Sequence, residues 1–212
     1  MNLEKRREEM RNFFNEKINT YDTVHIRDFM ETKESMINNL TGEIKKVLDL
    51  GAGTGLELIP FFKKYPDARV TAIDTSEKML EELSKRDFAD KVETICGDFL
   101  DIDYENEYDA VISTSALHHF DEDTKASLYK KIYKALKQNG LFANADRIAK
   151  SQEDQDYIIK EYINNPTLYK HMDTPITKDN EIKLLKKAGF EDLIVLDAKR
   201  EDYALIIAKK IV

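Results

Sequence analysis

The sequence predicts an α/β protein with a seven-strand, mostly parallel sheet, an antiparallel terminal strand pair and helices on both faces. From residue 43 onward, short β-rich runs alternate with segments of helical period, which implies parallel strands joined by helices. Three of the seven glycines fall within five residues directly after the first predicted strand, as expected where backbone turns sharply or approaches a ligand. The last two β-rich runs are separated only by a short charged turn, which suits an antiparallel pair.

The segment before residue 43 has a different pattern from the rest of the chain. Apolar residues recur at helical spacing around Phe13 and again around Phe29, which predicts two helices that end before Gly42. Beyond it, the predicted strands are residues 45–50, 69–74, 92–96, 108–114, 141–145, 192–198 and 203–209. The predicted helices between them are one over residues 54–64, one capped by Ser76, one capped by Asp121 and stopped by Gly140, and one that ends at Gly189.

The pattern predicts one main domain with two additions. Residues 1–42 are expected to form an N-terminal helical lid, and residues 43–212 the α/β domain. Residues 150–176 are polar and contain two prolines, which indicates a helix-and-loop insertion after the fifth strand.

Charge and composition exclude several classes of function. Lys and Arg total 33 and Asp and Glu total 41, a formal net charge of −8, which argues against a nucleic-acid partner. The longest apolar run, residues 204–208, is far shorter than the ~20 residues that span a bilayer, and no apolar segment follows the charged N-terminus. Because there is one cysteine and no ligand pair with His-x-x-x-His spacing, no metal is expected; a metal held by some set of His25, His119, Asp146, His171 and Asp173 is the alternative. The sequence thus predicts a cytoplasmic protein without a membrane segment.

The glycine turn carries the strongest functional signal. In such a sheet, ligands bind above the C-terminal strand ends, where helix N-termini offer amide donors. Val47-Leu-Asp-Leu-Gly-Ala-Gly-Thr-Gly55 leaves the first strand there, and Asp74 ends the second strand, where a carboxylate can accept both hydroxyl protons of a ribose. Two ligand classes share this layout: nicotinamide or flavin dinucleotides, and S-adenosylmethionine (SAM).

Two residues favour SAM over a dinucleotide. A dinucleotide fingerprint has the form G-x-G-x-x-G, and Leu56 stands where the third glycine would be. Asp49 precedes the first glycine by two residues, where its charge would repel a pyrophosphate and attract a ligand with a sulfonium and an ammonium group.

At these residues the chain resembles the class I SAM-dependent methyltransferases, in particular their small-molecule branch. Four segments carry the resemblance: Leu48-Asp-Leu-Gly-Ala-Gly-Thr-Gly55, Ala72-Ile-Asp-Thr-Ser-Glu-Lys-Met-Leu80, Gly97-Asp-Phe99 and Tyr108-Asp-Ala-Val-Ile-Ser-Thr-Ser-Ala-Leu-His-His-Phe120. The resemblance implies a Rossmann-like fold, SAM as cofactor and methyl transfer to a small molecule. The cofactor-binding residues that it implies are Tyr21, Asp49, Gly51, Ala52, Gly53, Thr54, Gly55, Asp74, Thr75, Met79, Asp98, Phe99, Thr114 and Ser115.

The sequence departs from the family at two places. Lys137-Gln-Asn-Gly140 stands where the family often has Pro-Gly-Gly, which concerns helix termination more than chemistry. No Asn/Asp-Pro-Pro-Tyr/Phe follows the fourth strand, which argues against an adenine or a glutamine amide as the methyl acceptor.

The acceptor side has weaker signals. Methyl transfer is an in-line displacement, so the protein must align the reactants, exclude water and remove a proton where the nucleophile carries one. The resemblance implies that His119, after the fourth strand, acts as a base or orients the acceptor; a helix-entry residue tied to its loop is the alternative. Further candidates for acceptor contacts are His25, His118, Asp146, Tyr169 and His171. Packing between helices and ordinary loop or ion-pair roles are the alternatives for these residues.

Two other functions remain open from the sequence. A nucleotide-dependent oxidoreductase of the NAD(P) type would share the layout of the sheet, although Leu56 and Asp49 count against it. A SAM-binding module without transferase activity would retain the same binding motifs. The identity of the acceptor and the oligomeric state are not encoded in any motif.

Overall fold

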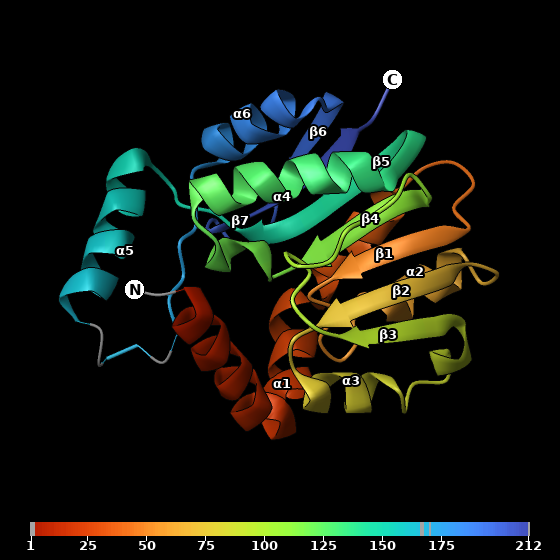
Figure 1. The fold of residues 1–212 in the computed structure, drawn as a ribbon, viewed down its shortest axis with the longest axis horizontal. Coiled ribbons are helices and arrows are strands. Elements are labelled where there is room, and N and C mark those ends of the chain that lie inside the picture. Colours follow the sequence, from red (N-terminus) through yellow and green to blue (C-terminus); the bar gives the residue numbers. More distant parts are fainter. Residues whose placement is uncertain (1–2, 166–167, 170, 212) are drawn as a thin grey trace.

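One seven-strand sheet forms the centre of the fold. The structure, a computed structural model, describes residues 3–165, 168–169 and 171–211. The strand order is β3-β2-β1-β4-β5-β7-β6. β1 to β5 are parallel, whereas β7 runs antiparallel to both β5 and β6, so the predicted fold class is confirmed (Figure 1). The strands are β1 (Lys46–Leu50), β2 (Arg69–Asp74), β3 (Val92–Cys96), β4 (Tyr108–Thr114), β5 (Leu136–Arg147), β6 (Glu191–Asp197) and β7 (Tyr203–Lys209).

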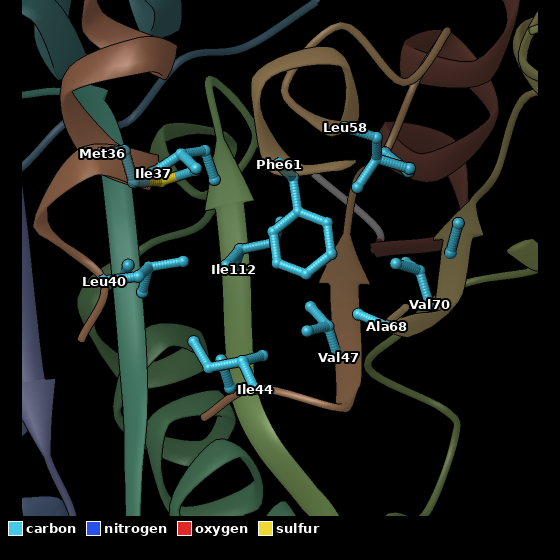
Figure 2. Close-up of a cluster of buried hydrophobic side chains, with 14 of the residues drawn as sticks. Met36, Ile37, Leu40, Ile44, Val47, Leu58, Phe61, Ala68, Val70 and Ile112 are labelled. Atoms are coloured by element: carbon cyan, nitrogen blue, oxygen red, sulfur yellow. The ribbon is translucent and has the colours of Figure 1, made fainter. Parts of the chain in front are cut away.

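Helices cover both faces of the sheet and enclose two apolar cores. The helices are α1 (Leu3–Asn39), α2 (Leu58–Lys64), α3 (Glu77–Leu83), α4 (Glu122–Ala135), α5 (Gln152–Asn164) and α6 (Lys178–Ala188), with short 3-10 turns η1 (Ala89–Lys91) and η2 (Leu117–His119). One core lies beneath the end of α1, α2 and α3, and the other beneath α4 and α6. Because strand side chains alternate, Val47 of β1 enters the first core and Leu48 the second. Figure 2 shows part of the first core, where Phe61 packs among aliphatic side chains over β1 and β4.

The N-terminal segment is one helix, so the prediction of two was wrong. α1 is continuous from Leu3 to Asn39. No glycine or proline occurs before Gly42, so the shift in apolar phase that predicted a boundary does not interrupt the helix. Tyr21 and His25 therefore lie within a helix and not in an interhelical turn. Figure 1 shows α1 beside the arrowheads of β1 and β2, which is where a ligand of this sheet is expected.

Two further helix boundaries differ from those predicted. α2 begins at Leu58 and not at residue 54, because Gly55 has a φ of +73°, which no right-handed helix can contain. α4 ends at Ala135 and not at Gly140, and β5 begins at once with Leu136. Asn139 has a φ of +64°, a left-handed conformation that asparagine tolerates better than most residues. A right-handed helix cannot include this residue and so cannot extend to Gly140.

A buried ion pair joins α4 to α6. The ammonium group of Lys125 contacts the carboxylate of Glu181, and both side chains are almost fully buried, at 0% and 2% exposed. The hydroxyl of Tyr129 also donates a hydrogen bond to Glu181. Removing Lys125 would leave a buried carboxylate without its cation.

The Lys125→Ala variant is therefore expected to lower the free energy of unfolding by about 3–5 kcal/mol. Urea denaturation measures this loss. Lys130→Ala, which removes an exposed lysine from the same helix, is the matched control and should change stability by less than about 0.5 kcal/mol. Equal stabilities for the two variants would contradict the assignment of the pair.

Candidate active site

A cavity opens at the C-terminal ends of β1, β2 and β4, beneath α1. The space between the protein atoms there is about 640 Å³, a figure that includes open solvent. Ten of the sequence-predicted residues line it: Tyr21, Gly51, Gly53, Asp74, Thr75, Met79, Asp98, Phe99, Ser115 and His119. Five lining residues were not predicted: Arg7, Met10, Phe14, Ala116 and Phe120.

The glycine turn forms the floor of this cavity. Gly51 and Gly53 have φ values of +75° and +52°, in the left-handed region that favours glycine. A Cβ added to Gly51 would lie 2.5 Å from the Cβ of Ala116, which is too close for any side chain. The turn thus leaves a bare backbone surface that a ligand can approach.

Asp74 lies at the edge of the turn, at the end of β2. One carboxylate oxygen accepts a hydrogen bond from the amide of Gly53 at 2.8 Å, and the other accepts from the amide of Ser76 at 2.8 Å. Burial raises the pKa of Asp74 to about 6 although these amides act to lower it. The carboxylate is rigidly placed and can accept hydroxyl hydrogen bonds where it faces the cavity.

Asp98 and Phe99 lie on the neighbouring side of the cavity, after β3. The guanidinium of Arg7, from the first turns of α1, approaches Asp98 at 2.7 Å and also donates to Asp101. The backbone amide of Leu100 donates to Asp98 at 2.8 Å. The first turns of α1 therefore close the part of the cavity where the resemblance places the adenine ring.

Asp49 lies beneath the glycine turn and not on the cavity wall. It is 0% exposed, and the polar group beside it is another carboxyl, that of Glu57, so no donor among the described residues supports its anion. Burial and the neighbouring charge of Glu57 raise the pKa of Asp49. An unpaired buried carboxylate is costly, so this position fits a ligand that brings a cationic donor to the turn, as the ammonium group of SAM would.

Glu57 and Lys33 complete the buried charges around Asp49. The ammonium of Lys33, from α1, donates to Glu57 at 2.6 Å and also contacts Thr114. Although burial acts to raise it, Lys33 holds the pKa of Glu57 below its ordinary value. Lys33 thus pairs with Glu57, and the raised pKa of Asp49 favours its neutral acid beside this pair until a ligand brings a second positive charge.

α1 is fastened directly to the glycine turn. Asp22 accepts a hydrogen bond from the hydroxyl of Thr54 at 2.5 Å and pairs with the guanidinium of Arg86 at 2.5 Å. The hydroxyl of Tyr21 lies 3.4 Å from the position of a Cβ on Gly53, so the tyrosine covers the turn. Thr54 thus anchors the helix and does not line the cavity, and Ala52 and Gly55 are likewise buried behind the turn.

The two adjacent histidines after β4 have separate surroundings. His119 lines the cavity, and burial lowers its pKa to about 4, so its ring is neutral at pH 7. His118 points away from the cavity, with Nδ1 2.6 Å from Asp146 at the end of β5. Asp146 also accepts hydrogen bonds from the amides of Leu117 and His118 and therefore fixes the turn that carries both histidines.

The remaining candidates on the acceptor side differ in their distance from the cavity. The ring of His25 stacks on Tyr21, with 3.9 Å between ring centroids, and so lies one layer behind the wall. His171 packs against Phe13 with 4.1 Å between centroids and approaches His119 at 5.1 Å. Tyr169 packs against Tyr162 of α5 and is 39% exposed, so the fold does not bring it to the cavity.

Several site residues carried no signal in the sequence. Arg7, Phe14 and Lys33 belong to α1, where charged and aromatic residues are frequent and no motif marks one of them. Asp173 was a candidate only as part of the loop after α5, and no spacing pattern indicated that it approaches three histidines. Glu57 follows the glycine motif by two residues, so its proximity to Asp49 was the one feature that spacing alone could have indicated.

A methyltransferase-domain family matches residues 47–140. Malonyl-(acyl-carrier protein) O-methyltransferase from Priestia megaterium is 32% identical over 135 residues, which cover 60% of this chain and 47% of that relative. Carboxy-S-adenosyl-L-methionine synthase from Nautilia profundicola is 25% identical over 220 residues, which cover 96% of this chain and 93% of that relative. The chain thus spans about half of the first relative and nearly all of the second.

Solved structures share the fold. A SAM-dependent methyltransferase from Thermotoga maritima has a TM-score of 0.70 at 20% identity and covers 95% of this chain and 99% of its own. Human N-acetylserotonin methyltransferase in complex with SAM has a TM-score of 0.66 at 18% identity and covers 94% of this chain and 55% of its own. A methyltransferase domain thus matches the residues that carry the glycine turn and the acidic strand ends, and the whole chain resembles SAM-dependent methyltransferases in sequence and in fold.

Proposed function

We propose that the protein transfers a methyl group from SAM to a small-molecule acceptor bound beneath α1. The observation that carries this proposal is the enclosure of the cavity: α1 lies over the strand ends, and Phe14 and Tyr21 close it opposite Gly51. A cavity covered by a helix suits a small molecule better than a folded protein or a nucleic acid. The net charge of −8 supports the same choice.

Different residues around the cavity would bind different parts of the cofactor. Gly51 and Gly53 would receive the methionine portion above Asp49, Asp74 would accept the ribose hydroxyls, and Asp98 with Phe99 would hold the adenine. When bound, SAM supplies an activated methyl group on a sulfonium leaving group. Every other requirement falls on the chain: orientation, exclusion of water and control of the acceptor's proton.

His119 is the residue proposed to contact the acceptor. Its neutral imidazole lies on the cavity wall near Ser115 and Phe14, and Phe14 approaches its ring with 5.8 Å between centroids. A neutral imidazole can accept a proton from an acceptor hydroxyl, thiol or amine, or orient the acceptor by a hydrogen bond. His25 and His171 flank this region from α1 and from the insertion.

The N-terminal helix is proposed as a lid, as the sequence predicted for residues 1–42. Its support is the set of contacts that α1 makes with the cofactor region: Arg7 with Asp98, Asp22 with Thr54, and Lys33 with Glu57. Breaking these contacts would open the cavity from the side of α1.

No helix within the described ranges has the length and apolar character to cross a membrane.

The experiment that tests the function supplies SAM with a labelled methyl group to the purified chain. A cell lysate divided by ultrafiltration provides a small-molecule fraction and a macromolecular fraction as acceptors. We expect label to appear in the small-molecule fraction, together with S-adenosylhomocysteine (SAH). Label only in protein or RNA would contradict the small-molecule proposal.

The same reaction separates the rival functions. Mass spectrometry of the cofactor distinguishes SAH from carboxy-SAM, the product named for the Nautilia relative. A thermal-shift comparison of SAH with NAD⁺ tests the oxidoreductase alternative, and stabilisation by NAD⁺ alone would support it. Stabilisation by SAH without any transfer to either fraction would favour a binding module.

A further inference from the structure

A cluster of three histidines and one aspartate lies behind the acceptor side of the cavity. Three imidazole nitrogens approach the same oxygen, Oδ1 of Asp173: Nδ1 of His119 at 2.9 Å, Nε2 of His171 at 3.0 Å and Nε2 of His118 at 3.7 Å. His118, His119 and Asp173 are each less than 10% exposed, and one ligand atom from each lies within 4.8 Å of the others. From these contacts we propose that the cluster is a binding site for a divalent transition-metal ion, with Zn²⁺ as the best match.

The three distances from Oδ1 of Asp173 to the imidazole nitrogens lie close to the spacing of neighbouring zinc ligands. In a four-coordinate zinc site with bonds of about 2.0–2.1 Å, neighbouring ligand atoms lie roughly 3.3 Å apart. Oδ1 of Asp173 is buried among these imidazole nitrogens, two of which lie at hydrogen-bond distance from it. A metal ion would take the place of these contacts.

The surroundings of His118 match those of a metal-binding histidine. Its Nδ1 is 2.6 Å from Asp146, which selects the tautomer with a proton on Nδ1 and a lone pair on Nε2, the nitrogen that faces Asp173. Histidines that bind metals usually donate their other nitrogen to a carboxylate in this way. The amides of Leu117 and His118 hold Asp146 in place, so the orientation is built into the end of β5.

The aspartate is held by two further contacts. The guanidinium of Arg147 donates to Oδ2 of Asp173 at 2.8 Å and leaves Oδ1 to face the histidines. The amide of Thr174 donates to the carbonyl of His118 at 2.7 Å, which ties the loop of Asp173 to the turn after β4. The charge of Arg147 weakens attraction for a cation, but its side chain is 32% exposed and therefore partly screened by solvent.

The charge and the ligand type select the ion. Asp146, Asp173 and Arg147 give the cluster a formal net charge of −1 before any imidazole is counted, which a divalent ion would overcompensate by one. Nitrogen ligands with a single oxygen suit Zn²⁺, Co²⁺ or Fe²⁺ and not the all-oxygen preference of Mg²⁺ or Ca²⁺. His171, on the loop and 18% exposed, is the most accessible of the four ligands.

Metal binding would decide between the two roles proposed for His119. Coordination through Nδ1 leaves the proton on Nε2, so the ring would orient an acceptor by donating a hydrogen bond and would not act as a base. The site would also join the loop after α5 to the ends of β4 and β5, and so fix the acceptor side of the cavity. Neither consequence is needed to test binding.

The test is a Co²⁺ titration of the full chain after its metals have been removed with a chelator. We expect one Co²⁺ per chain, the visible absorption of a tetrahedral nitrogen–oxygen site, and displacement by one equivalent of Zn²⁺. Asp173→Asn and His171→Ala should each weaken binding at least about tenfold. His25→Ala removes the one histidine outside the cluster and should bind Co²⁺ like the wild type.

Circular dichroism and thermal stabilisation by SAH identify any variant that has not folded, and His171, on the loop, is the safer of the two substitutions. No uptake of Co²⁺ by the folded wild type would overturn the proposal and leave the histidines as hydrogen-bond partners of Asp173. Equal binding by the wild type and by folded His171→Ala and Asp173→Asn would overturn it as well. Because neither SAM nor an acceptor is present, this result is independent of the proposed function.

Discussion

Replacing Gly51 with alanine is expected to reduce the affinity for SAH by about 100-fold or more, equivalent to about 2.7 kcal/mol. The new Cβ would lie 2.5 Å from the Cβ of Ala116, and neither atom can rotate away. The φ of +75° adds backbone strain for any residue other than glycine, of order 1–3 kcal/mol. The turn must therefore shift, and its shift deforms the floor of the cavity. Calorimetric titration with SAH measures the affinity, and urea denaturation measures the accompanying loss of stability.

Gly97→Ala is the matched control for Gly51→Ala. Gly97 precedes Asp98 at the rim of the same site, but a Cβ there would meet no atom within 4 Å, and its φ is not in the left-handed region. We expect its stability to stay within about 0.5 kcal/mol of the wild type, with little change in SAH affinity. Similar losses in both variants would mean that any added methyl group near the site is harmful and would remove the steric argument.

Replacing Asp49 with asparagine is expected to lower the affinity for SAH more than tenfold while it stabilises the ligand-free protein. Asparagine has nearly the shape of the protonated acid, whose hydroxyl can donate to Glu57, but it cannot become the anion that a bound ammonium group requires. The loss of affinity and the gain of stability thus have one cause. Calorimetry and urea denaturation of the same variant measure the two effects.

The sign of the stability effect follows from the raised pKa of Asp49. Between the ordinary pKa of aspartate, about 3.9, and its raised value in the fold, the folded chain binds more protons than the unfolded chain. Stability of the ligand-free protein therefore falls as the pH rises through this window. Asp49→Asn removes this pH-dependent loss of stability. The variant should therefore be more stable than the wild type, most clearly at pH values above the raised pKa of Asp49. An asparagine variant that is less stable than the wild type at every pH would contradict the burial argument.

The sequence was sufficient for the sheet and for much of the cavity lining around the glycine turn because both are encoded locally. Strand and helix periods alternate along the chain, and the glycine turn, Asp74 and Asp98 each follow a strand whose end fixes their place. The predictions that were wrong concern helix boundaries, which depend on the backbone conformation of single residues. The left-handed φ of Gly55 delayed α2, and the absence of a helix breaker joined the two predicted N-terminal helices into α1.

The acceptor side was not predictable in the same way because its residues are distant in sequence. His119 and Asp173 are separated by the whole of α4, β5 and α5, so no spacing pattern relates them. The expectation that no metal binds depended on spacing, which is informative only when ligands share a helix or a turn. Lys33 likewise reaches Glu57 across 24 residues, through the packing of α1 on the glycine turn.

The most direct test of the account is the number of protons released when SAH binds. Titrations in two buffers of different ionisation enthalpy, repeated from about pH 5 to about pH 9, give that number for the wild type and for Asp49→Asn. Asp74, with a pKa of about 6, contributes mainly at the acidic end. If a bound ammonium group ionises Asp49, the wild type releases more protons on binding than Asp49→Asn does. Identical proton release by the two proteins, with identical affinity, would contradict the role of Asp49 beneath the glycine turn.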